Sequence, residues 1–196
     1  MTPRIDAAAF DVLFNDARTH NGWLPDPVPE AVLRTLYDTL RNGPTSMNSQ
    51  PLRLVFLTTD ASRQRLLPSL MSGNVEKTRT APVTVIVAYD SRFYDELPRM
   101  FYNPAARDLF AGNAALAEAT AFRNGSMQGG YLILAARALG LDCGPMSGVD
   151  LAKVNAEFFP DGRWKTNFLC NLGRGDPAKL MPRQPRLPFE EACLVL

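Results

Sequence analysis

The spacing of apolar residues predicts a series of helices along the chain. Leu33, Leu36 and Leu40 recur on one face of the clearest amphipathic stretch. Asp side chains can cap helix starts by accepting hydrogen bonds from exposed N–H groups, and Gly or Pro ends a helix. The predicted helices span residues 6–17, 29–42, 60–70 with an interruption at Pro68, 113–139 and 150–158.

Short apolar runs between these helices predict strands. The run at 82–89 (PVTVIVAY) is β-branched and apolar throughout, which predicts a strand buried on both faces. Further strands are expected at 52–58 and 165–172, and a short strand with a tight turn at 141–148. Residues 93–112 and the tail from residue 173 show no clear periodicity. Interleaved helices and strands, without a repeat or linker, predict one α/β or α+β domain over residues 1–196.

Composition narrows the class of protein. The chain has 196 residues, a formal net charge of +1 and 46% hydrophobic residues, typical of a soluble domain with a sizeable core. A near-neutral charge favours neither nucleic acid nor an anionic membrane surface as a partner. The N-terminus (MTPRIDAAAFDVLF) lacks the apolar segment of a signal peptide, and no run approaches the roughly 20 residues of a membrane span. We therefore expect a cytoplasmic protein.

Few residues offer catalytic or metal-binding chemistry. His20 is the single histidine, so neither a metal site nor a Ser-His-Asp triad is expected, and no phosphate-loop motif occurs. Residues 173–178 fit GxGxxA, but nearby prolines forbid the helix that a dinucleotide loop must lead into. Cys143, Cys170 and Cys193 form no CxxC pair and are interpreted as small buried apolar residues. A chain so poor in acid–base groups favours a cofactor that carries the chemistry.

The segments with the most polar and glycine chemistry are widely spaced along the chain. They are residues 16–21 (DARTHN), 44–51 (PTSMNSQP), 141–148 (LDCGPMSG) and 183–188 (RQPRLP). Together, in this order, they resemble the nitroreductase family, and the 44–51 loop is the most specific match. The resemblance covers about residues 10–190. It implies an α+β nitroreductase fold, with a central mixed β-sheet flanked by helices and an intertwined homodimer that builds each flavin site at the subunit interface.

The resemblance further implies FMN as cofactor and NADH or NADPH as co-substrate. Flavin N5 would carry the hydride, with no catalytic residue from the protein. Arg18 and Arg186 would hold the FMN phosphate, with Arg183 as a second candidate, because a guanidinium binds phosphate oxygens bidentately. A backbone N–H of Ser147 or Gly148 would donate to N5. The implied cofactor-binding residues are Arg18, Thr19, His20, Ser46, Asn48, Gln50, Pro145, Met146, Ser147, Gly148, Arg183 and Arg186.

Three segments resemble more closely the malonic semialdehyde reductase group of uracil degradation. They are residues 18–23 (RTHNGW), 101–104 (FYNP) and 122–128 (FRNGSMQ). This implies reduction of a small carboxylated aldehyde to 3-hydroxypropionate, with Arg123 gripping the carboxylate and His20 as a candidate proton donor. Alternatives are a generalist nitro or quinone reductase, a flavin storage protein, and a structural dimer without flavin.

Overall fold

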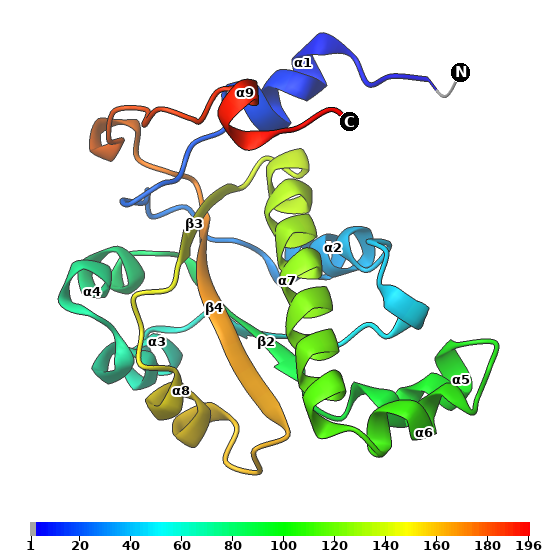
Figure 1. The fold of residues 1–196 in the computed structure, drawn as a ribbon. Helices are drawn as coiled ribbons and strands as arrows, with labels where there is room; N and C mark the ends of the chain where they lie inside the picture. Colours follow the sequence, from blue (N-terminus) through cyan, green and yellow to red (C-terminus); the bar gives the residue numbers. More distant parts are fainter. Residues whose placement is uncertain (1–2) are drawn as a thin grey trace.

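The computed structural model describes residues 3–196 and is built on an antiparallel sheet (Figure 1). Its strands are β1 (Leu52–Leu57), β2 (Val83–Asp90), β3 (Asp142–Met146) and β4 (Trp164–Gly173), in the order β1-β2-β4-β3. Every pairing between these strands is antiparallel. The expectation of a mixed sheet is therefore corrected to an antiparallel sheet. In the described residues, parallel pairing is confined to the isolated bridge between Thr19 and Cys143.

Helices cover both faces of the sheet. On one face, α2 (Glu30–Leu40) and α7 (Ala114–Ala138) bury Leu36 and Leu132 against inward residues of the strands. On the other face lie α3 (Asp60–Leu66), α4 (Ser72–Arg79) and α8 (Leu151–Phe158), with Leu66 and Val154 in a second core (Figure 1). Because both faces are covered, all eight residues of β2 are buried, as its unbroken apolar pattern predicts.

Caps and close packing explain the main helices. Asn113 accepts a hydrogen bond from Leu116 N and begins α7, while Asp150 caps α8. A Cβ at Gly129 would stand 2.7 Å from the Phe168 ring, so only glycine lets α7 approach β4 here. A Cβ at Gly130 would contact nothing within 4 Å, so close packing at that glycine is not found within one chain.

Short elements depart from the sequence pattern. The first helix is α1 (Ala7–Phe10), continued by a π-helical turn that ends at Asn15. The unpatterned region 93–112 forms a 3₁₀ turn and the short helices α5 (Leu97–Met100) and α6 (Ala106–Ala111). Helix α4 was not predicted, because Val75 is the only large apolar residue within it.

Both ends of the chain expose apolar side chains. The tail carries a 3₁₀ turn (Pro177–Lys179) and α9 (Phe189–Ala192), and Figure 1 draws α9 at the same end of the molecule as α1. Residues 181–196 are all exposed, so Cys193 is exposed, whereas the other two cysteines are buried as predicted. The prediction of a buried Cys193 is wrong for this chain alone, since no part of residues 3–196 buries the end of the tail. Among residues 3–196, no helix combines the length and apolarity that crossing a membrane requires.

Candidate functional site

The segment that begins at Arg18 is fixed to the edge of the sheet. Thr19 forms a parallel bridge with Cys143, and His20 N donates to the Cys143 carbonyl at 3.0 Å. The His20 side chain is 7% exposed, and its Nε2 lies 3.2 Å from Asp142 Oδ1. Thr19 is exposed beside it. The structure thus turns the His20 ring into the protein and leaves Thr19 at the surface.

The turn after β3 lies against α4. Met71 N and Asn74 Nδ2 both donate to the Gly148 carbonyl, at 3.1 and 2.7 Å. A Cβ at Gly148 would stand 2.5 Å from Asn74 Nδ2, so glycine is required for this close approach. One turn further along α4, Lys77 Nζ donates to Asn21 Oδ1 at 3.3 Å. Burial lowers the pKa of Lys77, so α4 brings a half-buried cation to the 18–21 segment.

The turn residues differ in their accessibility. Met146 is buried, Pro145 is half-buried and Ser147 is exposed. Among residues 3–196, no acceptor pairs with the backbone N–H of Ser147 or Gly148. These two N–H groups are therefore able to donate to a ligand at the surface of the turn.

Two of the three predicted phosphate-binding arginines meet where the tail crosses the N-terminal segment. Arg18 donates to the Met181 carbonyl, and Arg183 donates to the Asn15 carbonyl. Arg186 lies further along the exposed tail and donates only to carbonyls of its own turn, at 2.9 and 3.0 Å. In one chain, Arg18 and Arg183 each bind the backbone of the other's segment, whereas no hydrogen bond ties Arg186 to the segment of Arg18 among residues 3–196.

The 44–51 loop is tied to α7 and α5. Ser46 N donates to Asn124 Oδ1 at 2.8 Å, and Asn124 is 2% exposed. The Asn48 amide donates to the Met100 carbonyl at 2.7 Å and accepts from Gln50 Nε2 at 2.8 Å. Much of the amide chemistry of Asn48 therefore supports the loop itself.

The same loop holds strained backbone. Met47, Asn48 and Gln50 have φ of 52°, 50° and 41°, in the left-handed region that favours glycine. At its end, Leu52 N donates to the buried Gln128 Oε1 at 3.0 Å. Strain held by surrounding contacts is common where a backbone is shaped for a ligand.

A single chain does not bring all the predicted segments together. The 18–21 segment, the β3 turn and α4 lie on one side of α7, and the 44–51 loop lies on the other (Figure 1). Among residues 3–196, no hydrogen bond joins the loop to those segments. Arg123 lies on α7 next to Asn124, exposed and without an ion pair in the described part of the chain. It therefore belongs with the loop and not with the α4 side.

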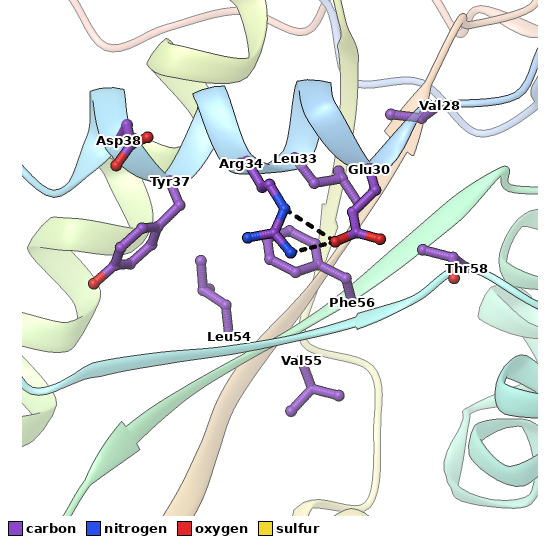
Figure 2. Close-up of a pocket in the computed structure, with 10 residues that line it drawn as sticks. All are labelled: Val28, Glu30, Leu33, Arg34, Tyr37, Asp38, Leu54, Val55, Phe56 and Thr58. Carbon is purple, nitrogen blue, oxygen red and sulfur yellow. Dashed lines mark hydrogen bonds and ion pairs between the residues drawn. The ribbon is translucent and has the colours of Figure 1, made fainter.

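A groove follows the free edge of β1 (Figure 2). It has a volume of about 730 Å³, and Leu33 of α2 lines it together with Leu54 and Phe56 of the strand. Within residues 3–196, β1 pairs only with β2, so its other edge is unpaired. Arg34 borders the groove and donates to Glu30 at 3.0 Å.

Several supporting residues were not identified from the sequence. Asn74 and Lys77 lie on the unpredicted α4, and their spacing of three residues on one helix face was the available signal. Asn124 and Gln128 were noted only within a matching segment, with no role. Asp142 was noted in the same way, although its carboxylate holds His20.

Comparisons with known proteins define the class and the family. The crystal structure of a provisionally assigned nitroreductase from Exiguobacterium sibiricum, in complex with FMN, superposes on this chain with a TM-score of 0.87. The two sequences are 17% identical, and the superposition covers 100% of both chains. The architecture is the nitroreductase fold. The nitroreductase family model matches residues 17–174, so the chain belongs to the nitroreductase family.

Curated relatives cover the chain almost completely. A protein of Ralstonia nicotianae, provisionally named NADH dehydrogenase/NAD(P)H nitroreductase, is 57% identical over 194 residues, with 99% of this chain and 100% of the relative covered. A protein of Cupriavidus pinatubonensis with the same provisional name is 55% identical over 186 residues, covering 93% and 95%. The similarity to these two relatives thus extends over nearly their full length.

Proposed function

We propose that this protein is an FMN-dependent NAD(P)H oxidoreductase that acts as a cytoplasmic homodimer. The observation that carries the proposal is the meeting of the 18–21 segment, the β3 turn and α4 at one end of the sheet. The FMN in a structural neighbour and the NAD(P)H in the relatives' names support it. Bound FMN would supply hydride transfer through N5, from NAD(P)H to the substrate.

The residues present fit a phosphorylated flavin. Arg18 and Arg183 supply guanidinium groups for the phosphate, and the exposed Thr19 adds a hydroxyl. The unpaired N–H groups of Ser147 and Gly148 suit an acceptor atom of the flavin ring. Arg186 completes the predicted phosphate set only if the tail moves or packs differently in the assembled protein.

A second copy completes the site. The 44–51 loop lies across α7 from the 18–21 segment and the β3 turn (Figure 1), so we infer that one flavin meets the two groups in different protomers. Leu116, Met127 and other large apolar side chains of α7 are exposed and available for a dimer interface. We infer that the loop of one protomer faces the phosphate side of its partner.

The exposed tail suits the groove along β1. Leu194, Val195 and Leu196 are 87%, 83% and 112% exposed, and an extended apolar segment can pair with an unpaired strand edge. We propose that the tail of one protomer occupies the β1 groove of its partner, which would make the dimer intertwined.

Native Cys193 provides a test of this pairing. In Thr58→Cys, the new thiol lines the groove and should form an intermolecular disulfide with the partner's Cys193 under mild oxidation. Non-reducing electrophoresis should show a covalent dimer that disappears when Cys193→Ser is added. Lys153→Cys, on exposed α8, is the matched control. A dimer band equally strong with the control would contradict tail docking at β1.

The flavin itself is tested by colour and titration. The purified protein should be yellow or take up added FMN, and NADPH or NADH should bleach it without oxygen. A colourless protein that binds no FMN would refute the proposed function. A protein that binds FMN but is not bleached would indicate flavin storage.

Within this function, we propose malonic semialdehyde as the substrate, reduced to 3-hydroxypropionate. The support is the resemblance of segments 18–23, 101–104 and 122–128 and the position of Arg123, an exposed cation next to Asn124, which holds the 44–51 loop. A guanidinium paired with the carboxylate would also orient the aldehyde carbon. The relatives' names favour a second candidate, a generalist nitroreductase.

Specificity constants separate the two candidates. The wild type should have a higher kcat/KM for malonic semialdehyde than for a neutral aldehyde or a nitroaromatic, and Arg123→Ala should reduce it for the carboxylated substrate alone. Equal or better turnover of the nitroaromatic by the wild type would favour the generalist. An equal loss on all three substrates would show that Arg123 supports the fold or the flavin.

A further inference from the structure

We infer that His20, Asp142 and Gly175 form a clamp that positions Arg18 for the FMN phosphate. The inference rests on the proposed function. It assigns His20 a positioning role through Arg18, in place of contact with the flavin or proton donation to the substrate.

The Asp142 carboxylate joins two distant segments. His20 Nε2 lies 3.2 Å from Asp142 Oδ1, within ion-pair distance, and Gly175 N donates to Asp142 Oδ2 at 2.8 Å. One side chain at the start of β3 thus binds the segment after Arg18 and the segment that leads into the tail. A hydrogen bond to a carboxylate is stronger than one between neutral groups, so the Gly175 contact and the nearby imidazole make this a firm junction.

Close packing adds to the junction. A Cβ at Gly175 would stand 1.8 Å from His20 Nδ1, so the imidazole lies directly on the Gly175 backbone. Trp23 forms an antiparallel bridge with Gly175, and Leu24 N donates to the carbonyl of Arg174 at 2.8 Å. The 19–24 segment is therefore held between β3 and residues 174–175.

The clamp fixes the backbone from which each of the two proposed phosphate-binding arginines extends. Arg18 lies two residues before His20, and Arg183 lies on the tail that leaves Gly175. Their contacts with Met181 and Asn15 are exposed, so they hold the arginines only weakly. The contact of the buried His20 ring with the half-buried Asp142 carboxylate is the firmer anchor beneath them.

The position of the ring argues against direct contact with the phosphate. His20 is 7% exposed, and its Nδ1 has no hydrogen-bond partner among residues 3–196 and is covered by Gly175. Both ring nitrogens therefore face protein. The effect of His20 on flavin binding must pass through the backbone to Arg18.

Riboflavin separates this positioning role from general support of the fold. Riboflavin has the same ring system and ribityl chain as FMN but no phosphate. A clamp that positions Arg18 affects FMN binding and leaves riboflavin binding unchanged. Loss of structure at the site weakens both.

The experiment measures the dissociation constants of FMN and riboflavin by flavin fluorescence on the full-length protein. The variants are His20→Leu, which removes the donor, and His20→Gln, whose amide can still donate to Asp142. Arg18→Ala is the direct control for phosphate contact. Tyr89→Phe, which loses a buried hydroxyl's hydrogen bond to Glu118 at the far end of the sheet, is the control for general destabilisation.

We expect His20→Leu to lower the preference for FMN over riboflavin about tenfold, because Arg18 would lose its charge-assisted contact with the phosphate. Arg18→Ala should lower this preference at least as much. His20→Gln should retain most of the preference, and Tyr89→Phe all of it. An unchanged preference in His20→Leu, or equal weakening of both flavins, overturns the clamp. A wild type that binds neither flavin overturns the proposed function itself.

Discussion

Asn124→Ala tests whether the hydrogen bond from α7 to the 44–51 loop maintains the conformation of that loop. The Asn124 side chain accepts from Ser46 N at 2.8 Å and donates to the Thr120 carbonyl at 2.8 Å. Alanine keeps the helix propensity high but removes both contacts. The loop would then lose its hydrogen bond to α7 at Ser46.

The magnitude follows from the loop backbone. Three left-handed residues, Met47, Asn48 and Gln50, each cost roughly 1 kcal/mol, so the loop stores about 3 kcal/mol of strain. One neutral hydrogen bond contributes about 1 kcal/mol, and a donor left without a partner costs about 1–3 kcal/mol. We therefore expect Asn124→Ala to lower the free energy of unfolding by about 1–2 kcal/mol, a shift in Tm of roughly 2–8 °C.

Flavin affinity gives the functional readout. If the relaxed loop no longer meets the flavin, the Kd of FMN should rise about tenfold, measured by fluorescence titration beside urea unfolding. Asn167→Ala is the matched control, because Asn167 makes a similar amide contact to Ser126 of α7 at 2.8 Å, away from the loop. If Asn124→Ala lost stability but bound FMN as the control does, the loop would not belong to the flavin site.

Three further changes test the phosphate site, the core and the charges. Arg18→Ala should weaken FMN binding by roughly one to two decades, and an unchanged Kd would refute the phosphate site. Leu36→Ala, at a fully buried position between α2 and the sheet, should lower the free energy of unfolding by about 2–5 kcal/mol; a loss below about 1 kcal/mol would contradict the packing described. Burial raises the pKa of Glu118, but hydrogen bonds from Tyr89 and Lys165 outweigh it and hold this pKa below its usual 4.5. Since the folded-state pKa is the lower one, the ionised carboxylate stabilises the fold fully above the unfolded-state value of 4.5 and loses this effect as pH falls from there through the folded-state pKa. The stability difference between wild type and Glu118→Gln should narrow on acidification, and a constant difference would refute this pairing.

The sequence predicts elements whose apolar pattern has one simple cause. Strand β2 is buried on both faces, so residues 83–89 are apolar apart from Thr84. Helix α2 packs one face on the sheet, so Leu33, Leu36 and Leu40 recur at helical spacing. These elements were predicted within one or two residues of their ends, because local pattern and burial agree.

The elements that were missed have no such pattern. Helix α4 contacts the rest of the protein largely through polar groups, such as Asn74 on the Gly148 carbonyl and Thr78 beside the Met146 sulfur. Hydrophobic periodicity does not record such contacts. The orientation of strand pairing was missed for a related reason, because it depends on which strands become neighbours, and this chain places β4 between β2 and β3.

The candidate site depends on pairs of residues that are far apart in the sequence. His20 and Asp142 are one such pair, and local patterns do not indicate that the two side chains meet. The sequence alone presents His20 as the single titratable imidazole, which favours a role in chemistry. The structure buries the ring, and burial is the property that reassigns it to positioning.

The segment 122–128 shows how a motif acquires a physical meaning. Asn124 and Gln128 are four residues apart, so both project from one face of α7. The Asn124 side chain accepts a hydrogen bond from Ser46 N near the start of the loop, and the Gln128 side chain accepts one from Leu52 N just after its end. Two amide side chains one helical turn apart thus hold both ends of a strained loop, and the residues between those ends include the ones proposed to contact the flavin. The spacing of the motif is therefore set by the length of the loop, and a substitution at either amide should change flavin binding without itself touching the flavin.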